Sequence, residues 1–390
     1  MRILYTIALG FIAALSWAQP VKEYFFLMRM DGEHTLESGH VTKIWGFSPE
    51  AGEGGDEELR LPSPTIRVQE GDSVVVRVIN PSEEGHTIHW HGLDVDQAND
   101  GVPAFSQFVL KGDTFHYRFR ATHAGNYIYH CHVTTTLHLM MGMYGSFIVD
   151  RPDQRVFAGG PRYDRDYDYL GSELDQSWND NYMMTGPFYT FEADHFLLNG
   201  KSGQQIYADS ALHVQLRQGD TVLLRLINIG YGIHTYEFPP AVTATAVASD
   251  GRAIPQAFTT SALDLYPGER YSVLLTPNST QPIDHIRVLY KNMIDRKVKG
   301  YNYIPINTSQ APVGIATGGE RPSFYPNPVR HTLQIANTDQ PIVWRVFSAT
   351  GQFVDSGSSP SITTSSWPSG WYVVEVQTAD EVWREKVVKR

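Results

Sequence analysis

The chain has 390 residues and a formal net charge of −11, and its lysines and arginines are dispersed rather than clustered. Nucleic acids and anionic membranes bind concentrated positive charge, so this composition argues against both as partners. At about 100–200 residues per domain, the length predicts two or three domains, each large enough for its own core.

The first 18 residues are typical of a secretory signal peptide. Arg2 supplies the positive start, residues 3–15 are mostly apolar, and Ser16-Trp17-Ala18 forms a small-x-small cleavage site. The apolar run is too short to span a membrane, and we expect no transmembrane segment elsewhere. The single cysteine, Cys131, has no partner for an internal disulfide, so it is either inert in a core or a reactive or ligand thiol.

The remaining chain shows the strand pattern of β-sandwiches. Short alternating runs rich in β-branched and aromatic residues recur between Gly, Pro, Asn and Asp. The clearest runs are Ser73–Ile79, Thr114–Phe119, Gly145–Val149, Thr221–Ile227, Tyr271–Leu275, His285–Tyr290, Trp344–Phe347 and Trp371–Val376. The one helical piece that we expect is a turn around Thr134–Leu139.

An internal repeat divides the chain. The segment TIRVQEGDSVVVRVINPSEEGHTIHWHG at 65–92 is echoed by HVQLRQGDTVLLRLINIGYGIHTYEFPP at 213–240. Two tandem copies of one β-sandwich are the simplest interpretation. The polar, Tyr/Asp-rich segment 152–181 predicts a long connection between them. The Gly/Ala/Pro-rich stretch 307–322 predicts a linker to a third, smaller β unit.

We therefore predict an all-β chain of five parts. They are a signal peptide at 1–18, a first sandwich at 19–152, a second at 153–306, the linker at 307–322 and a small C-terminal sandwich at 323–390.

Two segments of the first copy carry the chemistry: HTIHWHG at 86–92 and YHCHVTTTLHLMMGM at 129–143. Side chains alternate faces along a strand, so the pair at 89 and 91 shares one face, and so does the pair at 130 and 132. Two imidazoles, a thiolate and a weak thioether describe a blue-copper (type 1) electron-transfer site, whereas a structural zinc would use four strong ligands and no methionine. The predicted copper ligands are His86, Cys131, His138 and Met143. Met140 and Met141 are alternative candidates for the axial ligand, but we expect them to pack against other side chains instead.

These segments resemble the multicopper oxidase family, which includes laccases and, more distantly, copper nitrite reductases. The family hallmarks HxHG and HCHxxx…HxxxxM stand here as His89-Trp90-His91-Gly92 and His130-Cys131-His132…His138…Met143, within a match over about 60–305. The resemblance implies Greek-key cupredoxin sandwiches, with electrons passing from type 1 copper to a trinuclear type 2/type 3 copper site that reduces O₂. Half of that site would be His89, His91, His130 and His132. Asp100 stands where family members place an acid near it, which makes Asp100 a candidate proton donor.

The second copy departs from the family pattern. A trinuclear site needs eight histidines, and the first copy offers four. Where paired histidines would recur, the second copy reads His234 followed by Glu237-Phe238-Pro239-Pro240, and then Tyr290-Lys291-Asn292. Three outcomes stay open: donors from another protein or an oligomer such as a trimer, a smaller mononuclear or dinuclear site, or vestigial histidines. Four scattered histidines could complete a smaller site, although we expect structural or exposed roles for them: His195, His213, His234 and His285.

Residues 323–390 contain FYPNPVRHTLQI, WPSGWYVVEV and a basic end, WREKVVKR. They resemble the type A sorting domain of the type IX secretion system. The resemblance implies that this secretion machinery is a partner and that the protein is secreted or displayed on the cell surface.

The predicted function is a laccase-like, copper-dependent oxidase that takes electrons from phenols or metal ions and passes them to O₂. The alternative is a secreted blue-copper electron carrier or copper-binding protein without turnover. Nitrite reduction ranks below both, because His89 occupies the place of the expected catalytic aspartate and the second-domain histidine ligand is not evident.

Overall fold

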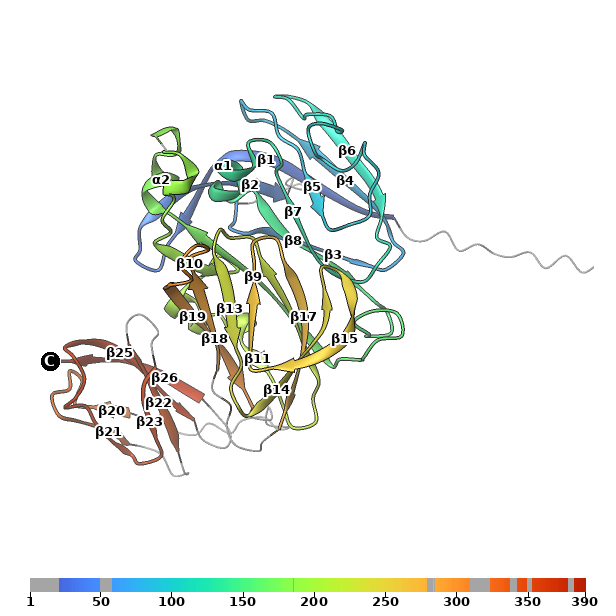
Figure 1. Ribbon diagram of the computed structural model, residues 1–390. Helices are drawn as coiled ribbons and strands as arrows, with labels where there is room; N and C mark the ends of the chain where they lie inside the picture. The colour runs from blue at the N-terminus through green and yellow to red at the C-terminus, as the bar shows by residue number, and fades with distance from the viewer. Residues whose placement is uncertain are drawn as a thin grey trace, which may run out of the picture.

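The computed structural model describes residues 21–49, 58–184, 186–278, 283, 285–308, 323–336, 342–348, 353–377 and 382–390. The predicted signal peptide lies outside these residues, and so does the predicted linker apart from its first two positions. The described residues form three β-sandwiches in chain order, which confirms the all-β fold with two tandem sandwiches and a smaller C-terminal one (Figure 1).

The first sandwich packs the sheet β2-β1-β4-β6 against the sheet β3-β8-β7-β5. Its strands are β1 Val21–Thr35, β2 Val41–Pro49, β3 Ser63–Gln69, β4 Ser73–Ile79, β5 His89–His91, β6 Thr114–Arg120, β7 Gly125–His130 and β8 Tyr144–Asp150. In β4, Val74, Val76 and Val78 are buried while the residues between them are partly exposed, so the alternation seen in the sequence sets which face meets the core. Every residue of β7 is buried, and the strand ends at His130, the first histidine of the pair at 130 and 132.

The second sandwich packs the sheet β10-β9-β12-β17-β14-β15 against the sheet β11-β19-β18-β13-β16. Its strands are β9 Arg165–Leu174, β10 His195–Leu198, β11 Val214–Gln215, β12 Val222–Asn228, β13 Ile233–Glu237, β14 Val242–Ser249, β15 Arg252–Thr260, β16 Ala262–Leu265, β17 Arg270–Pro277, β18 His285–Lys291 and β19 Val298–Asn307. Strand β9 lies within the segment expected to be a connection, so that expectation was wrong. Its alternation is Asp with Tyr rather than polar with aliphatic, and Asp166 is satisfied by Arg67 and Arg225.

The C-terminal sandwich has the sheets β20-β21-β24 and β23-β22-β25-β26. Its strands are β20 Ser323–Tyr325, β21 Thr332–Ala336, β22 Val343–Ser348, β23 Phe353–Gly357, β24 Ser361–Thr363, β25 Gly370–Gln377 and β26 Val382–Lys389. It has its own apolar core and contacts the second sandwich through a small cluster of Tyr207, Tyr303 and Phe347.

Among the described residues, three short α-helices interrupt the strands: α1 Thr135–Met141, α2 Gln176–Asp180 and α3 Gly203–Ala208. Helix α1 coincides with the predicted helical turn, whereas α2 and α3 were not expected. None of the described helices is long and apolar enough to cross a membrane.

An apolar cluster joins the first two sandwiches. Leu36, Ile128 and Ile148 of the first pack with Leu170 and Ile229 of the second in one buried group. Beside it, the buried guanidinium of Arg225 lies 2.8 Å from Asp150 and 2.7 Å from Asp166. Apolar packing and this ionic network therefore fix the two sandwiches together.

Candidate metal centre

Three of the four predicted type 1 ligands converge in the interior of the first sandwich. His86 follows β4 and forms an isolated bridge with Val109, Cys131 comes directly after β7, and His138 lies in α1. The Cys131 Sγ atom is 3.1 Å from His138 Nδ1 and 3.7 Å from His86 Nδ1. All three side chains are buried, and their donor atoms lie within 4.8 Å of one another.

The backbone around α1 places the fourth predicted ligand, Met143, beside this group. The Met143 amide donates to the His138 carbonyl over 2.9 Å, and the Met143 carbonyl accepts from the Cys131 amide over 3.0 Å. Gly142 ends the helix with φ of 108°, a left-handed conformation that favours glycine. Met143 is fully buried; Met140 and Met141 are equally buried, in the same core cluster.

Burial sets the protonation states of this group. Burial, followed by the nearby His138, lowers the pKa of His86 to about 3, so its imidazole is neutral at ordinary pH. Burial raises the pKa of the Cys131 thiol to about 11. A metal ion would therefore displace one proton from Cys131 and none from the imidazoles.

Sequence reasoning did not identify two neighbours of His138. The carboxylate of Glu84, half exposed, lies 3.4 Å from His138 Nε2, a buried atom that otherwise has no hydrogen-bond partner in the described structure. The indole of Trp45 packs edge-on against the His138 ring, with the centroids 5.2 Å apart. Only the fold brings β2 and the loop after β4 to α1, so no sequence spacing could reveal these contacts.

The other four predicted histidines form a second group. His89 is paired with His130 across β5 and β7, and the donor atoms of His89, His91 and His130 lie within 4.8 Å of one another. The His132 ring joins them, with its centroid 5.2 Å from that of His89 and 5.9 Å from that of His130. The strand parity read from the sequence therefore brings these four side chains together.

Hydrogen bonds to backbone carbonyls orient two of these rings. His89 Nδ1 donates to the Asp100 carbonyl over 2.8 Å, and His130 Nδ1 donates to the Cys131 carbonyl over 2.9 Å. Each ring keeps its Nε2 lone pair for a metal. The Asp100 carboxylate lies 3.3 Å from His89 Nδ1 and is partly exposed, so the predicted proton donor is at the edge of this group.

Two histidines of this group, His91 and His130, are neutral at ordinary pH in the metal-free chain. Burial lowers the pKa of His130 to about 3, and burial together with Arg270 lowers the pKa of His91 to about 4. Neutral imidazoles in mutual contact are ready metal ligands.

Arg270 reaches this group from the second sandwich, a role that sequence reasoning did not predict. Its buried guanidinium packs on Gly92, directly after His91, where any Cβ would collide with Nη2. It lies 2.9 Å from Asp250 and 2.8 Å from the Gly268 carbonyl. The second sandwich therefore supplies a cation, rather than further imidazoles, to this side of the histidine group.

The alignment of the second copy with the histidine-cysteine-histidine segment was wrong by three residues. His89 pairs with His130 in β5 and β7, whereas Glu237 pairs with Arg287 in β13 and β18. Strand register therefore sets Arg287-Val288-Leu289, rather than Tyr290-Lys291-Asn292, against His130-Cys131-His132. Alignment by residue similarity cannot detect such an offset, because register depends on cross-strand pairing.

Within the described ranges, no histidine of the second sandwich joins either group. His234 bonds to Glu173, His213 to the Ile206 carbonyl and His195 to Gln176, while His285 packs against Tyr303.

The residues present fit copper. A soft thiol between two neutral imidazoles, with a buried thioether in the adjoining loop, is the donor set of a blue-copper site. The four-imidazole group suits copper as well.

Comparisons with known proteins agree with this geometry. Two models described as multicopper oxidase match residues 58–154 and 153–295, and a secretion system C-terminal sorting domain model matches 323–390. An L-ascorbate oxidase of Cucumis sativus is 30% identical over 296 residues, which cover 65% of this chain but only 47% of that protein. The chain thus spans about half the length of this curated relative.

Solved structures share the architecture. A blue copper oxidase from Nitrosomonas europaea is 25% identical, with a TM-score of 0.59 and coverage of 74% of this chain and 86% of that one. A copper nitrite reductase from the same organism, 21% identical with a TM-score of 0.57 over 74% and 94% of the chains, shares the fold. The chain accordingly belongs to the multicopper oxidase family and carries a C-terminal sorting domain of a secretion system.

Proposed function

We propose that this protein is an exported, copper-dependent oxidoreductase of laccase-like type, which passes electrons from phenols or metal ions to O₂. The observation that carries the proposal is the convergence of His86, His138 and Cys131 in one buried group, with the four-histidine group attached to the same cysteine. In this assignment Met143 would be the fourth ligand of the type 1 copper.

Copper bound at these donors supplies one-electron chemistry that the side chains alone do not perform. Cys131 is flanked in sequence by His130 and His132, so the backbone joins the two groups by a short covalent path. His138 is buried but contacts the half-exposed Glu84, and we infer that reductants would deliver electrons on this side. Asp100, in contact with His89 and partly exposed, relays protons from water to the four-histidine group.

The four-histidine group requires further donors to hold a trinuclear site. We infer that another chain supplies them, either a copy of this protein in an oligomer such as a trimer or a different partner. The N-terminal signal peptide and the sorting domain would together carry the protein across both membranes to the cell surface or beyond.

A second candidate function is an electron carrier that binds one copper and does not turn over. It is favoured by one observation: within the described ranges, the second sandwich contributes no imidazole to either histidine group.

The test is to load the purified mature protein with copper, count copper atoms per chain and measure O₂ uptake with a phenolic reductant. We expect an intense blue band, type 2 and type 3 spectral signatures, and O₂ uptake. One copper per chain with the blue band alone and no O₂ uptake would identify the carrier instead. A protein without any blue band would refute both assignments.

A further inference from the structure

The helix that carries His138 is too short to be stable by itself. Helix α1 has seven residues, and isolated helices shorter than about 12–15 residues are marginal in water. Its N-cap, Thr134, has φ of 41° and makes no side-chain capping bond, so the start of the helix is strained and lacks a cap. The position of His138 therefore depends on what packs against α1.

The second sandwich binds α1 near both of its ends. In the last turn, the Asn179 side-chain amide donates to the Met140 carbonyl over 3.3 Å. In the first turn, the Tyr231 hydroxyl donates to the Thr136 carbonyl. Asn179 is fully buried and belongs to α2, between β9 and β10, and Tyr231 lies between β12 and β13. Both donors thus come from the second sandwich, whereas both acceptors belong to the helix of the first.

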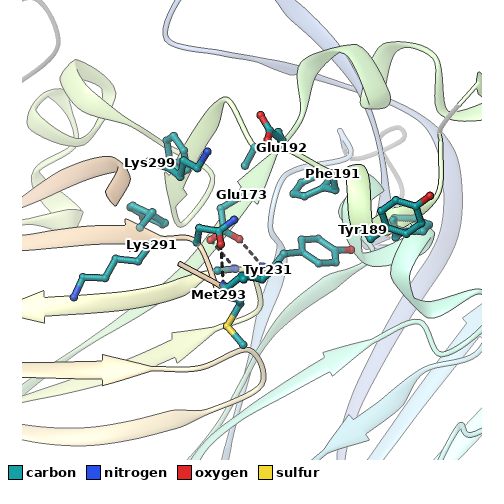
Figure 2. A pocket seen from close by; sticks show the side chains of 15 residues that line it. Glu173, Tyr189, Phe191, Glu192, Tyr231, Lys291, Met293 and Lys299 are labelled. Atoms are coloured by element: carbon teal, nitrogen blue, oxygen red, sulfur yellow. Dashed lines mark hydrogen bonds between the residues drawn. The ribbon is translucent and has the colours of Figure 1, made fainter. Parts of the chain in front are cut away.

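These two donors are themselves anchored. The Asn179 side-chain amide also donates to the Lys43 carbonyl of β2 over 3.2 Å. The backbone amide of Tyr231 donates to the Glu173 carboxylate over 2.6 Å, a bond drawn as a dashed line in Figure 2. The Tyr231 ring packs on Phe191 in the wall of the same cavity, with the centroids 4.8 Å apart. Neither donor is therefore free to follow the helix if the helix shifts.

Helix α2 and the residues after it also support the His138 imidazole. Asp180, the last residue of α2, accepts from Thr42 Oγ1 over 2.7 Å, which fixes α2 to β2. Tyr182 packs edge-on against Trp45, with the centroids 4.8 Å apart. Trp45 is fully buried and meets the His138 ring at 5.2 Å. A change in the position of this segment would therefore reach His138 through Trp45.

A shift of α1 would change the geometry around the thiol. His138 Nδ1 lies 3.1 Å from the sulfur of Cys131, which follows a different element, β7. Met143 comes after α1, and its amide donates to the His138 carbonyl. The helix therefore sets where two of the four predicted ligands stand relative to Cys131. The properties of a copper–thiolate site depend on that arrangement and on the groups that hold the ligands.

We propose that Asn179, Tyr182 and Tyr231 are positioning residues of the type 1 site. The second sandwich contributes no histidine to either group within the described ranges; in this role it holds α1 so that His138 meets Cys131. The inference rests on the proposed function, because it requires the type 1 site, and it gives the second sandwich a task in that site.

The test compares copper-loaded variants by visible absorption and spin resonance. Asn179→Ala and Tyr231→Phe each remove one bond to α1, and Tyr182→Ala removes the ring behind Trp45. All three should keep a blue band but change its wavelength and the copper hyperfine splitting. Loss of groups that orient metal ligands typically weakens metal binding by about 10–100-fold, so copper affinity should fall as well. Tyr231→Phe removes only a hydroxyl group, which keeps the test valid if Asn179→Ala does not fold.

Asn126→Ala is the matched control. Asn126 is a buried asparagine of β7 whose side-chain amide donates to the Leu226 and Tyr271 carbonyls, each over 3.2 Å. It crosses the same junction between the sandwiches, but its bonds go to β12 and β17 rather than to α1. This variant should lower the free energy of unfolding and leave the blue band and the hyperfine splitting unchanged.

Hydrogen exchange of the copper-free protein tests the same contacts without a metal. The amides of α1 and Met143 should exchange roughly two- to tenfold faster in Asn179→Ala and Tyr231→Phe, with no such local change in Asn126→Ala. An unchanged blue band in all three variants, unchanged exchange, or the same changes in Asn126→Ala would each overturn the inference and leave the proposed function intact. An unmodified protein without a blue band would instead refute the proposed function, and this inference with it.

Discussion

At the scale of single residues, the position of Cys131 decides what the protein can do. Its sulfur is buried between two imidazole nitrogens, and its neighbours in the chain belong to the other histidine group. A thiol in this position is both the softest donor of one group and the covalent link to the next.

Replacing this thiol tests the assignment of the type 1 ligands. Cys131→Ser should abolish the intense blue band of the copper-loaded protein while the fold persists, because the hydroxyl is smaller and faces the same imidazoles. The measurement is the visible spectrum with circular dichroism. Met140→Leu, at an equally buried neighbour outside the proposed ligand set, should keep the band; its loss there would mean that the axial ligand is misassigned.

The stability of the copper-free protein should depend on pH through the buried histidines. The pKa values of His86, His91 and His130 are lowered in the folded chain to about 3 or 4. The unfolded chain therefore binds more protons below about pH 6.5, and the free energy of unfolding falls as the pH drops from there toward 4. Urea midpoints at pH 7.5 and 5.0 should show this decrease.

The double variant His91→Gln/His130→Gln supplies the control for this pH effect. It should show a shallower pH dependence, because it removes two of the titrating groups. A midpoint that is the same at both pH values in the unmodified chain would contradict the explanation.

Gly92 tests the contact between Arg270 and the histidine group. It has φ of 90°, and a methyl group there would collide with the Arg270 guanidinium. Gly112 has a similar φ of 81° but open space around it. Gly112→Ala should cost about 1–2 kcal/mol from backbone strain alone, and Gly92→Ala should cost more and weaken copper binding at the four-histidine group. Equal losses in chemical denaturation would show that Arg270 moves aside freely.

At the scale of elements, hydrophobic alternation predicted the positions of strands correctly where the alternating residues were β-branched. The strand Ser73–Ile79 was predicted with the bounds that β4 has, and α1 lies within two residues of the predicted helical turn. Strand β9 was missed because its alternation is Asp and Tyr, and its polar positions are stabilised by arginines distant in sequence.

The residues of the candidate metal centre also fall into those that the sequence could predict and those that it could not. Residues linked by strand parity, such as His89 with His91, could be grouped from spacing, because one strand carries both. Trp45, Glu84 and Arg270 could not be found, because their contacts with the histidines arise only when separate elements pack. The three-residue error in the alignment of β18 also arose because pairing between strands, which the sequence does not show, sets the register.

At the scale of the whole molecule, the ionic network around Arg225 secures the junction between the first two sandwiches. Arg225 is 1% exposed and bridges Asp150 and Asp166, and the Tyr163 hydroxyl lies 3.2 Å from its guanidinium. Arg225→Met would leave two carboxylates with less compensation, so the free energy of unfolding should fall by about 3–5 kcal/mol. Chemical denaturation provides the measurement.

An exposed ion pair gives the matched comparison. Arg287→Met removes the partner of Glu237, both partly exposed to solvent, and should change stability by at most about 1 kcal/mol. A loss at Arg225 no larger than this would mean that apolar packing alone holds the junction.

The apolar cluster shared by the two sandwiches also bears on how the chain matures. The cluster includes Leu36, near the start of the described chain, and Ile229, which follows β12. During synthesis the first sandwich therefore keeps part of its apolar surface uncovered until the second has emerged. A nascent chain of this kind resists early folding and favours binding by holding chaperones, which would suit the proposed export of this protein in an unfolded state.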